Sequence, residues 1–295
     1  MALDALEVLA PAKVNLFLAV LGKRSDGYHD LVSVMQKLDL VDRLLLSREG
    51  RGISLSCCPA TVPDDCRNLA WQAARLFFDQ TGVEDNLRIT LRKAIPVAAG
   101  LGGGSSDAAA VLVGLNRLCS LGLTADALCK MAARLGADVP FFVADSTTAL
   151  ATGTGTELQA IDGPEDYWLV LVNPGVAVST RWVYENFLLT SEVNPYTLGG
   201  YFCAAKKAEA HLAAVFSSEP GGHRLFNDLE SVTVVAHPVI GEIKEQLLDD
   251  GAFAALMSGS GPTVFGLFRQ RGLAEESCSH FQRRYREVFL VAPLT

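Results

Sequence analysis

The residues with the clearest chemical potential form a glycine-rich segment from Pro96 to Ala108 (PVAAGLGGGSSDA). Four glycines lie at positions 100, 102, 103 and 104, and glycine lets a backbone approach a bulky anion because it has no Cβ. Ser105 and Ser106 follow and add hydroxyl donors. Such a loop suits phosphate groups where a helix begins directly after it. Asp107, in the first turn of that helix, could assist a metal ion, but the pattern assigns no metal ligand.

The elements on either side of the loop agree with this interpretation. The alternating segment Leu87–Arg92 predicts a strand that enters the loop, and an alanine-rich segment from Ser105 or Ser106 to about Leu118 predicts a helix that leaves it. The loop lacks the Gly-Lys-Ser/Thr ending of a Walker loop. It also lacks the dinucleotide fingerprint Gly-x-Gly-x-x-Gly, because Ser105 occupies the third glycine position. The sequence therefore predicts a phosphate cradle of a different kind.

Composition excludes several classes of protein. The 295 residues are 49% apolar and 20% charged, which predicts a globular chain with a substantial core and favours two domains. The net charge of −8 opposes nucleic-acid binding, which needs a basic face. No apolar run is long enough for a bilayer, and Met1–Ala10 has no basic residue. We therefore expect no membrane segment, no secretory signal and a cytoplasmic location. The seven cysteines, an odd number, predict free thiols.

The polar, glycine-bearing stretch 153–164 predicts a linker between two domains, 1–155 and 165–295. The elements expected after it follow the order β-α-β-β-α-β of a ferredoxin-like sandwich, with further helices inserted. These elements are the strand Trp168–Val172, the helix Val232–Leu248, the strands Ala252–Met257 and Thr263–Phe268, the helix Leu273–Arg286 and the strand Val288–Val291. In the first domain, Asn68 predicts the start of a helix over Leu69–Thr81 that ends at Gly82. The fold class predicted is α+β.

Three segments resemble the motifs of the superfamily of galactokinase, homoserine kinase, mevalonate kinase and phosphomevalonate kinase (GHMP kinases). The glycine-rich loop, with the pattern Pro-x-x-x-Gly-Leu-Gly-Gly-Gly-Ser-Ser, resembles the second motif. Pro11–Leu18 (PAKVNLFL) resembles the first, and Met257–Phe265 (MSGSGPTVF) resembles the third, a glycine turn that supports the active-site loop. The motifs occur in the family's order and span almost the whole chain.

This resemblance implies a two-domain GHMP-kinase fold, with an N-terminal ribosomal-protein-like α/β domain and a C-terminal ferredoxin-like domain. It also implies transfer of a phosphate group from ATP, with Mg²⁺, to a hydroxyl group of a small molecule. Three further segments, Gly22–His29, Leu135–Phe142 and Asn227–Glu230, resemble those of one member of the superfamily. The substrate of that member is a cytidine diphosphate derivative used for isoprenoid precursors. The partners implied are this small molecule, no nucleic acid and no membrane, and the chain would be a monomer or a homodimer.

Carried over position by position, the resemblance implies a catalytic pair, Lys13 and Asp138, in which Asp138 takes the proton from the acceptor hydroxyl. Asn15 would help to position the acceptor. Tyr28 and His29 would hold the cytosine ring, and Tyr184 would stack on it, although Trp182 or Phe187 could serve instead. The residues implied in ATP binding are Pro96, Gly100, Leu101, Gly102, Gly103, Gly104, Ser105 and Ser106.

Other interpretations remain open at this stage. A kinase for mevalonate, homoserine or a sugar would keep the loop, but these acceptors carry no cytosine for an aromatic pair to hold. The presence of Lys13 and Asp138 opposes a nucleotide-binding protein without turnover. The negative net charge opposes an RNA-binding protein of similar fold, an alternative that rests on fold analogy alone. Apart from the motifs, Asp138 could be a helix cap, and Asn227 and Asp228 a loop-and-cap pair.

Overall fold

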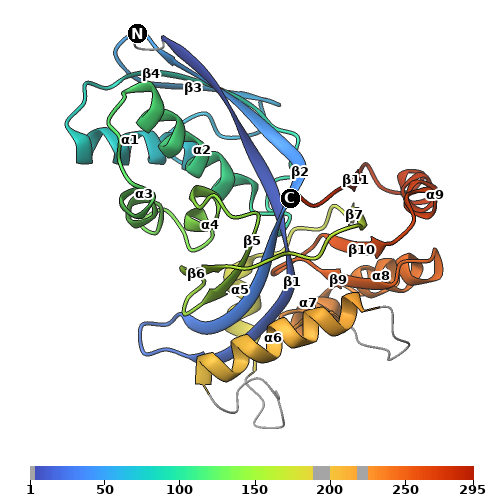
Figure 1. The fold of residues 1–295 in the computed structure, drawn as a ribbon. Coiled ribbons are helices and arrows are strands. Elements are labelled where there is room, and N and C mark those ends of the chain that lie inside the picture. Colours follow the sequence, from blue (N-terminus) through green and yellow to red (C-terminus); the bar gives the residue numbers. More distant parts are fainter. Residues whose placement is uncertain (1–3, 189–199, 218–224) are drawn as a thin grey trace. The chain divides into compact units, whose positions relative to one another are not determined.

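The computed structural model describes residues 4–188, 200–217 and 225–295, with only the backbone described for 200–203. The described chain forms two compact units, each built from several segments. The first unit runs up to Ala12 and includes Leu40–Val97 and Gly102–Ser146. The second includes Lys13–Asp39, Ala98–Leu101 and the described residues after Ser146. Two long strands, β1 (Ala5–Lys23) and β2 (His29–Arg48), contribute residues to both units (Figure 1).

The first unit packs helices against a sheet whose strands alternate in burial. β4 (Asn86–Arg92) pairs antiparallel with the later part of β2, and β3 (Gly52–Cys58) pairs parallel with β4. Leu87, Ile89 and Leu91 of β4 are fully buried, as the alternation predicts. The helices of this unit are α1 (Leu69–Thr81), α2 (Gly103–Leu118), α3 (Ala125–Ala132) and α4 (Val139–Val143).

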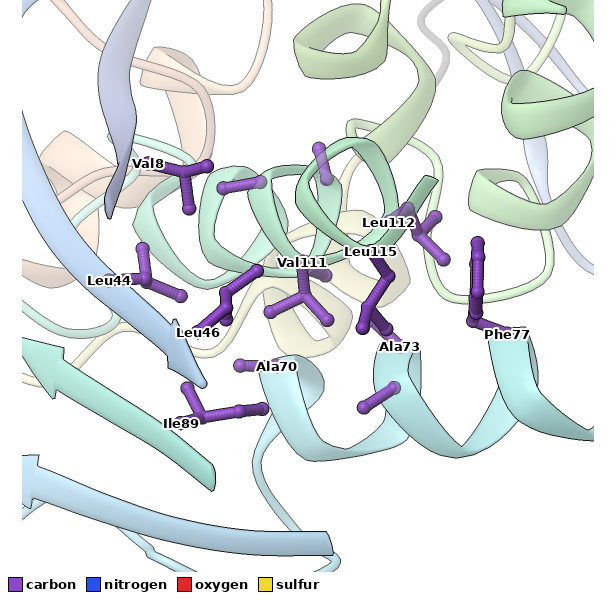
Figure 2. Close-up of a cluster of buried hydrophobic side chains, with 14 of the residues drawn as sticks. Val8, Leu44, Leu46, Ala70, Ala73, Phe77, Ile89, Val111, Leu112 and Leu115 are labelled. Carbon is purple, nitrogen blue, oxygen red and sulfur yellow. The ribbon is translucent and has the colours of Figure 1, made fainter. Parts of the chain in front are cut away.

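The core of the first unit lies between this sheet and helices α1 and α2 (Figure 2). Val111 and Leu115 of α2 lie in one cluster with Leu44 and Leu46 of β2 and with Phe77 of α1. The prediction for α1 is confirmed at both ends. The Asn68 side chain accepts a hydrogen bond from the Ala70 N–H, and Gly82 ends the helix with φ of 69°. The helix after the glycine-rich loop begins at Gly103, two or three residues earlier than the expected start at Ser105 or Ser106.

The second unit contains the predicted ferredoxin-like sheet. Its four strands are antiparallel in the order β11-β7-β10-β9, and α8 and α9 connect and cover them with the predicted β-α-β-β-α-β order. Apolar side chains of α8 and α9 share a core with β7 and β10. The bounds are β7 (Trp168–Asn173), α8 (Val239–Asp249), β9 (Ala254–Met257), β10 (Val264–Phe268), α9 (Arg271–Gln282) and β11 (Glu287–Val291).

Two sequence-based expectations in this unit are wrong. The stretch 153–164, predicted as a linker, contains β6 (Glu157–Ala160), which forms a hairpin with β5 (Thr148–Thr152). The helix expected over Val232–Leu248 is two helices, because Pro238 has no N–H to continue the first one. The remaining elements are α5 (Thr180–Asn186), α6 (Gly200–Phe216), β8 (Phe226–Asn227) and α7 (Glu230–Ala236). The predicted domain boundaries, 1–155 and 165–295, stay a prediction.

The C-terminal residues run beside β2. Asp39 N–H donates to the Ala292 carbonyl (3.0 Å), and Asp39 Oδ1 accepts from Ala292 N–H (2.9 Å). Leu294 N–H donates to the Lys37 carbonyl (2.9 Å), and the buried Gln36 amide donates to the Leu294 carbonyl (2.9 Å). These bonds make the tail part of the second unit. Among the helices of the described residues, none has the length and apolar character needed to span a membrane.

Candidate active site

The glycine-rich loop enters α2 through two glycines in the left-handed region. Gly100 has φ of 78° and Gly102 has φ of 71°, which favours glycine at both positions. The first bond that closes the helix runs from Ser106 N–H to the Gly102 carbonyl (2.9 Å). Because the N-cap residue is Gly102, it offers no side-chain acceptor to the N–H groups of the first turn. This helix end directs backbone donors and the positive end of its dipole into the loop, which suits a phosphate group.

The side chains of the loop differ in exposure. Gly104 is exposed and Ser105 is half-buried, whereas Ser106 is 1% exposed. The Ser106 hydroxyl has no hydrogen-bond partner among the described residues, which is costly for a buried polar group. Pro96 and Leu101 are both buried. The loop thus has the backbone donors, the open glycine surface and an unsatisfied hydroxyl that a bound phosphate requires.

The third glycine motif lies directly against Gly100. The Ser258 hydroxyl donates to the Gly100 carbonyl (2.9 Å), and Thr263 N–H donates to the Ala99 carbonyl (3.3 Å). A Cβ on Gly100 would lie 2.3 Å from the Ser258 carbonyl oxygen, a separation that real Cβ atoms essentially never show. Gly100 is therefore required for close packing as well as for its backbone conformation. The turn supports the loop, as the resemblance implies.

Lys13 and Asn15 lie beside the same turn, on β1. The Lys13 Nζ donates to Asn15 Oδ1 (2.5 Å), and both side chains are 4% exposed. Asn15 in turn donates to the Ser33 hydroxyl (2.8 Å) on β2. A Cβ on Gly259 would lie 3.6 Å from Lys13 Nζ, and Lys13 N–H donates to the Leu101 carbonyl (2.9 Å). The second unit thus brings together Lys13, Asn15, the start of the loop and the third motif. Lys13 is buried, not solvent-facing.

Asp138 belongs to the first unit, where it precedes α4. It is half-buried and occupies the N-cap position, but its side chain makes no cap hydrogen bond within the described chain. Asp138 therefore occupies the N-cap position, as that interpretation predicts, but its side chain does not cap the helix. Val139 and Pro140, which follow it, are buried and fix the backbone on its C-terminal side. Lys13 and Asp138 lie in different compact units, so their pairing stays a prediction.

Two residues proposed for cytosine come together in the second unit. The His29 and Tyr184 rings stack, with centroids 5.1 Å apart and planes inclined by 30°. Burial, together with the charge of Lys23, lowers the pKa of His29, so the imidazole is neutral near pH 7. Tyr28 is 66% exposed in the turn before His29. Of the alternatives to Tyr184, Trp182 is 41% exposed, and Phe187 packs against the core of this unit.

Asn227 has a clearer role than the sequence indicated. Its side-chain amide is 6% exposed and donates to the carbonyls of Met257 (2.8 Å) and Gly259 (2.7 Å). Its Oδ1 accepts from Leu229 N–H (3.0 Å). Asn227 therefore joins β8 to the start of the third glycine motif. The cap part of the loop-and-cap interpretation is wrong, because the N-cap of α7 is Leu229 and no side chain of the described residues caps the helix. The Asp228 carboxylate accepts instead from Val20 N–H (2.7 Å).

Sequence reasoning missed a buried ionic cluster beside the phosphate loop. Lys93, Asp42 and Asp107 come from three separate segments of the first unit, and Lys93 bonds both carboxylates. Asp107 is 2% exposed and its Oδ2 accepts from Lys93, whereas its Oδ1 has no hydrogen-bond partner among the described residues. The suggestion that Asp107 could assist a metal ion stays a prediction. The one available signal was a lysine between a strand and the loop, which is too common to single out.

Comparison with known proteins matches segments in both halves of the chain to the GHMP kinases. The model of the GHMP kinases N terminal domain matches residues 68–146, and that of the GHMP kinases C terminal domain matches residues 211–287. A protein of Geobacter metallireducens named 4-diphosphocytidyl-2-C-methyl-D-erythritol kinase is 50% identical over 267 residues, 90% of each chain. One of the same name from Syntrophotalea carbinolica is 47% identical over 288 residues, 97% of this chain and 98% of that protein.

Solved structures give the same result. A crystal structure of 4-(cytidine 5'-diphospho)-2C-methyl-D-erythritol kinase has a TM-score of 0.81 at 33% identity, covering 98% of this chain and all of that one. A homoserine kinase from Cytophaga hutchinsonii has a TM-score of 0.75 at 20% identity, covering 100% and 96% of the two chains, and supports the fold alone. With both domain models matched and relatives near 50% identity over most of its length, the chain belongs to the GHMP kinase family.

Proposed function

We propose that this protein transfers the γ-phosphate of ATP to the 2-hydroxyl of 4-diphosphocytidyl-2-C-methyl-D-erythritol, giving the 2-phosphate and ADP for isoprenoid precursor synthesis by the non-mevalonate pathway. The observation that carries the proposal is the uncapped glycine N-terminus of α2, whose loop rests on the third glycine motif next to Lys13 and Asn15. The choice of acceptor is supported by the names of relatives that are 44–50% identical.

Phosphoryl transfer needs positioned groups and charge stabilisation more than covalent work by the protein. In the proposal, Gly100–Ser106 wrap the ATP phosphates, with Pro96 at the entrance of the loop. Lys13 stabilises negative charge at the reacting oxygens, and Asp138 accepts the proton of the acceptor hydroxyl. General base assistance of this kind contributes about 10²–10⁴ in rate. Loss of Asp138 therefore lowers turnover much more than it lowers ATP affinity.

The cytosine ring is assigned to Tyr28, His29 and Tyr184, with Asn15 near the acceptor. The stacked His29–Tyr184 pair supports this, because aromatic faces and a few polar edges suffice to hold a pyrimidine. A neutral His29 offers one N–H donor and one acceptor nitrogen to the base edge. The exposed Tyr28 ring is available for contact with a ligand.

ATP use follows from the family, and Mg²⁺ is part of the proposal. Mg²⁺ when bound would neutralise charge on the phosphates, and we assign it no protein ligand. The domain division at 1–155 and 165–295, a cytoplasmic location, and a monomeric or homodimeric state also belong to the proposal.

The test is ADP release by the purified protein with ATP and Mg²⁺, comparing the diphosphocytidyl compound with mevalonate, homoserine and galactose. We expect turnover with the cytidine compound alone. Asp138→Asn should lower kcat by about 10²–10⁴ while leaving ADP binding near that of the wild type. Asp145→Asn, the same substitution at an exposed position just beyond the other end of α4, is the matched control and should keep its activity.

The outcomes separate the parts of the proposal. Turnover of another acceptor would keep the kinase assignment and reject the cytosine roles of Tyr28 and His29. A normal kcat in Asp138→Asn would reject Asp138 as the base. Absence of turnover with every acceptor, in protein that binds ADP, would reject the kinase proposal itself.

A further inference from the structure

A buried ionic cluster ties the phosphate loop to the sheet of the first unit. Lys93 follows β4, Asp42 belongs to β2, and Asp107 lies in the first turns of α2. Lys93 Nζ donates to Asp107 Oδ2 (2.7 Å) and bonds Asp42 Oδ2. The side chains of Lys93, Asp42 and Asp107 are 7%, 0% and 3% exposed. Charges this deeply buried are tolerated only when they are paired, so each group constrains the other two.

Asp42 also fixes the chain just before the loop. Its Oδ1 accepts hydrogen bonds from the backbone N–H groups of Ala94 (2.6 Å) and Ile95 (2.9 Å). Pro96, the first residue of the loop, follows directly. One carboxylate thus binds both the ammonium group of Lys93 and the backbone that leads into the loop. The position of residues 93–95 is set by β2 as much as by β4.

The cluster reaches the first residue of α2. A Cβ placed on Gly103 would lie 3.1 Å from Lys93 Nζ and 3.0 Å from Ile95 Cγ2. The ammonium group therefore packs against the backbone whose N–H groups face the loop. On the following turn, Lys93 holds Asp107, so the start of α2 is fixed on two sides. Gly103 is the residue that allows this approach.

The protonation of the cluster agrees with one cation shared by two carboxylates. Burial and the charge of Asp42 raise the pKa of Asp107 to about 7, although Lys93 opposes the shift. Burial alone would lower the pKa of Lys93, but the charges of Asp107 and Asp42 outweigh it and raise that pKa. Lys93 therefore stays protonated throughout the physiological range and can donate to Asp42 and to Asp107 in either protonation state of Asp107.

We propose that Lys93 is a positioning residue for ATP, because its buried ammonium group joins Asp107 at the start of α2 to Asp42 on β2 and thereby fixes the direction of the phosphate-binding loop. Lys93 does not touch the substrate in this role. The inference rests on the proposed function in one respect only, namely that the loop Gly100–Ser106 binds the phosphates of ATP.

The test compares three variants in the full-length protein. Lys93→Met removes the cation. Asp107→Leu releases α2 from Lys93 but leaves the balanced Lys93–Asp42 pair, so it avoids two unpaired carboxylates. The control is Arg75→Met, because Arg75 of α1 also bridges two carboxylates in this unit, Asp79 (2.5 Å) and Asp85 (2.8 Å). Measurements are kcat, KM for ATP, KM for the acceptor, and calorimetric binding of ADP with Mg²⁺.

We expect Lys93→Met and Asp107→Leu to raise KM for ATP and weaken ADP binding by about tenfold or more, because small displacements of a binding group are costly. KM for the acceptor should stay within about twofold of the wild type. Arg75→Met should change neither. Folding is checked by circular dichroism, and if Lys93→Met does not fold, Asp107→Leu decides the question.

Two results would overturn the inference. One is a folded variant whose KM for ATP and ADP affinity equal those of the wild type. The other is an equal rise in both KM values, which a general loss of stability would produce. Failure of the proposed function is distinguishable, because a wild type that binds ADP without turnover still allows the ADP measurement to decide the role of Lys93.

Discussion

Gly100→Ala is the most direct test of how the third glycine motif supports the phosphate loop. The new Cβ would lie 2.3 Å from the Ser258 carbonyl oxygen, whereas ordinary contacts begin at 3.4 Å. The Ser258 carbonyl is a backbone group and a Cβ is fixed rigidly to the backbone of residue 100, so neither can rotate away. The loop therefore has to move by about 1 Å. A displacement of about 1 Å at a reacting site can lower the rate about 100-fold. The left-handed φ adds roughly 1–2 kcal/mol of strain for alanine. We therefore expect kcat/KM for ATP to fall about 100-fold.

Gly122→Ala is the matched control for this experiment. Gly122 also has positive φ, at 64°, but a Cβ there would meet nothing within 4 Å. Its substitution should lower the free energy of unfolding by roughly 1–2 kcal/mol and leave kcat/KM for ATP unchanged. Steady-state kinetics and urea unfolding measure both effects. If the two variants lose the same stability and Gly100→Ala keeps its kinetics, the contact with Ser258 does not position the loop.

Three further predictions concern single side chains. Asn227→Ala leaves the buried carbonyls of Met257 and Gly259 without their donor, so urea unfolding should show a free energy of unfolding lower by roughly 2–3 kcal/mol. A decrease below about 0.5 kcal/mol would contradict a stabilising role of these two hydrogen bonds. The raised pKa of Asp107 contributes stability that is fully present below the unfolded pKa of 3.8 and is lost as the pH rises through about 7. The stability of Asp107→Asn relative to the wild type should therefore increase between pH 5.5 and pH 8, by on the order of 2 kcal/mol, and a constant difference would contradict the raised pKa. The His29 imidazole should titrate below its ordinary pKa of 6.5 in an NMR titration assigned with His29→Gln, and a value above 6.5 would contradict its burial.

Features specified by neighbouring residues were predictable from the sequence. The residues that begin and end α1, Asn68 and Gly82, lie next to the helix in the sequence, so both ends of the helix could be predicted from local residues alone. Helices α7 and α8 could not be separated from the sequence, because apolar periodicity continues across Pro238 and predicts a single helix. The strand β6 was missed because exposed polar residues, such as Glu157 and Gln159, give no alternation of apolar side chains.

The parts of the site that depend on distant partners were not predictable in this way. Lys93 and Asp42 are 51 residues apart in sequence, and nothing local to either one identifies the other. Asn227 is 32 residues from Gly259, which it holds. The roles of Lys13 and Asp138 came from resemblance to a family, since a lone lysine or aspartate carries no signal of its own. Buried polar pairing is a tertiary property and appears only once the strands are assembled.

The attachment of the C-terminal tail to β2 has a consequence for protein synthesis. Ala292 and Asp39 exchange bonds across 253 residues of sequence, so the second unit is complete only after nearly the whole chain has been translated. The first unit ends at Ser146 and has all its segments available much earlier. During synthesis, the segment of β2 around Asp39 therefore lacks its partner Ala292 while the second half of the chain is translated. Lys13 likewise lacks one of its neighbours until the third glycine motif has been translated, because Gly259 lies beside its ammonium group.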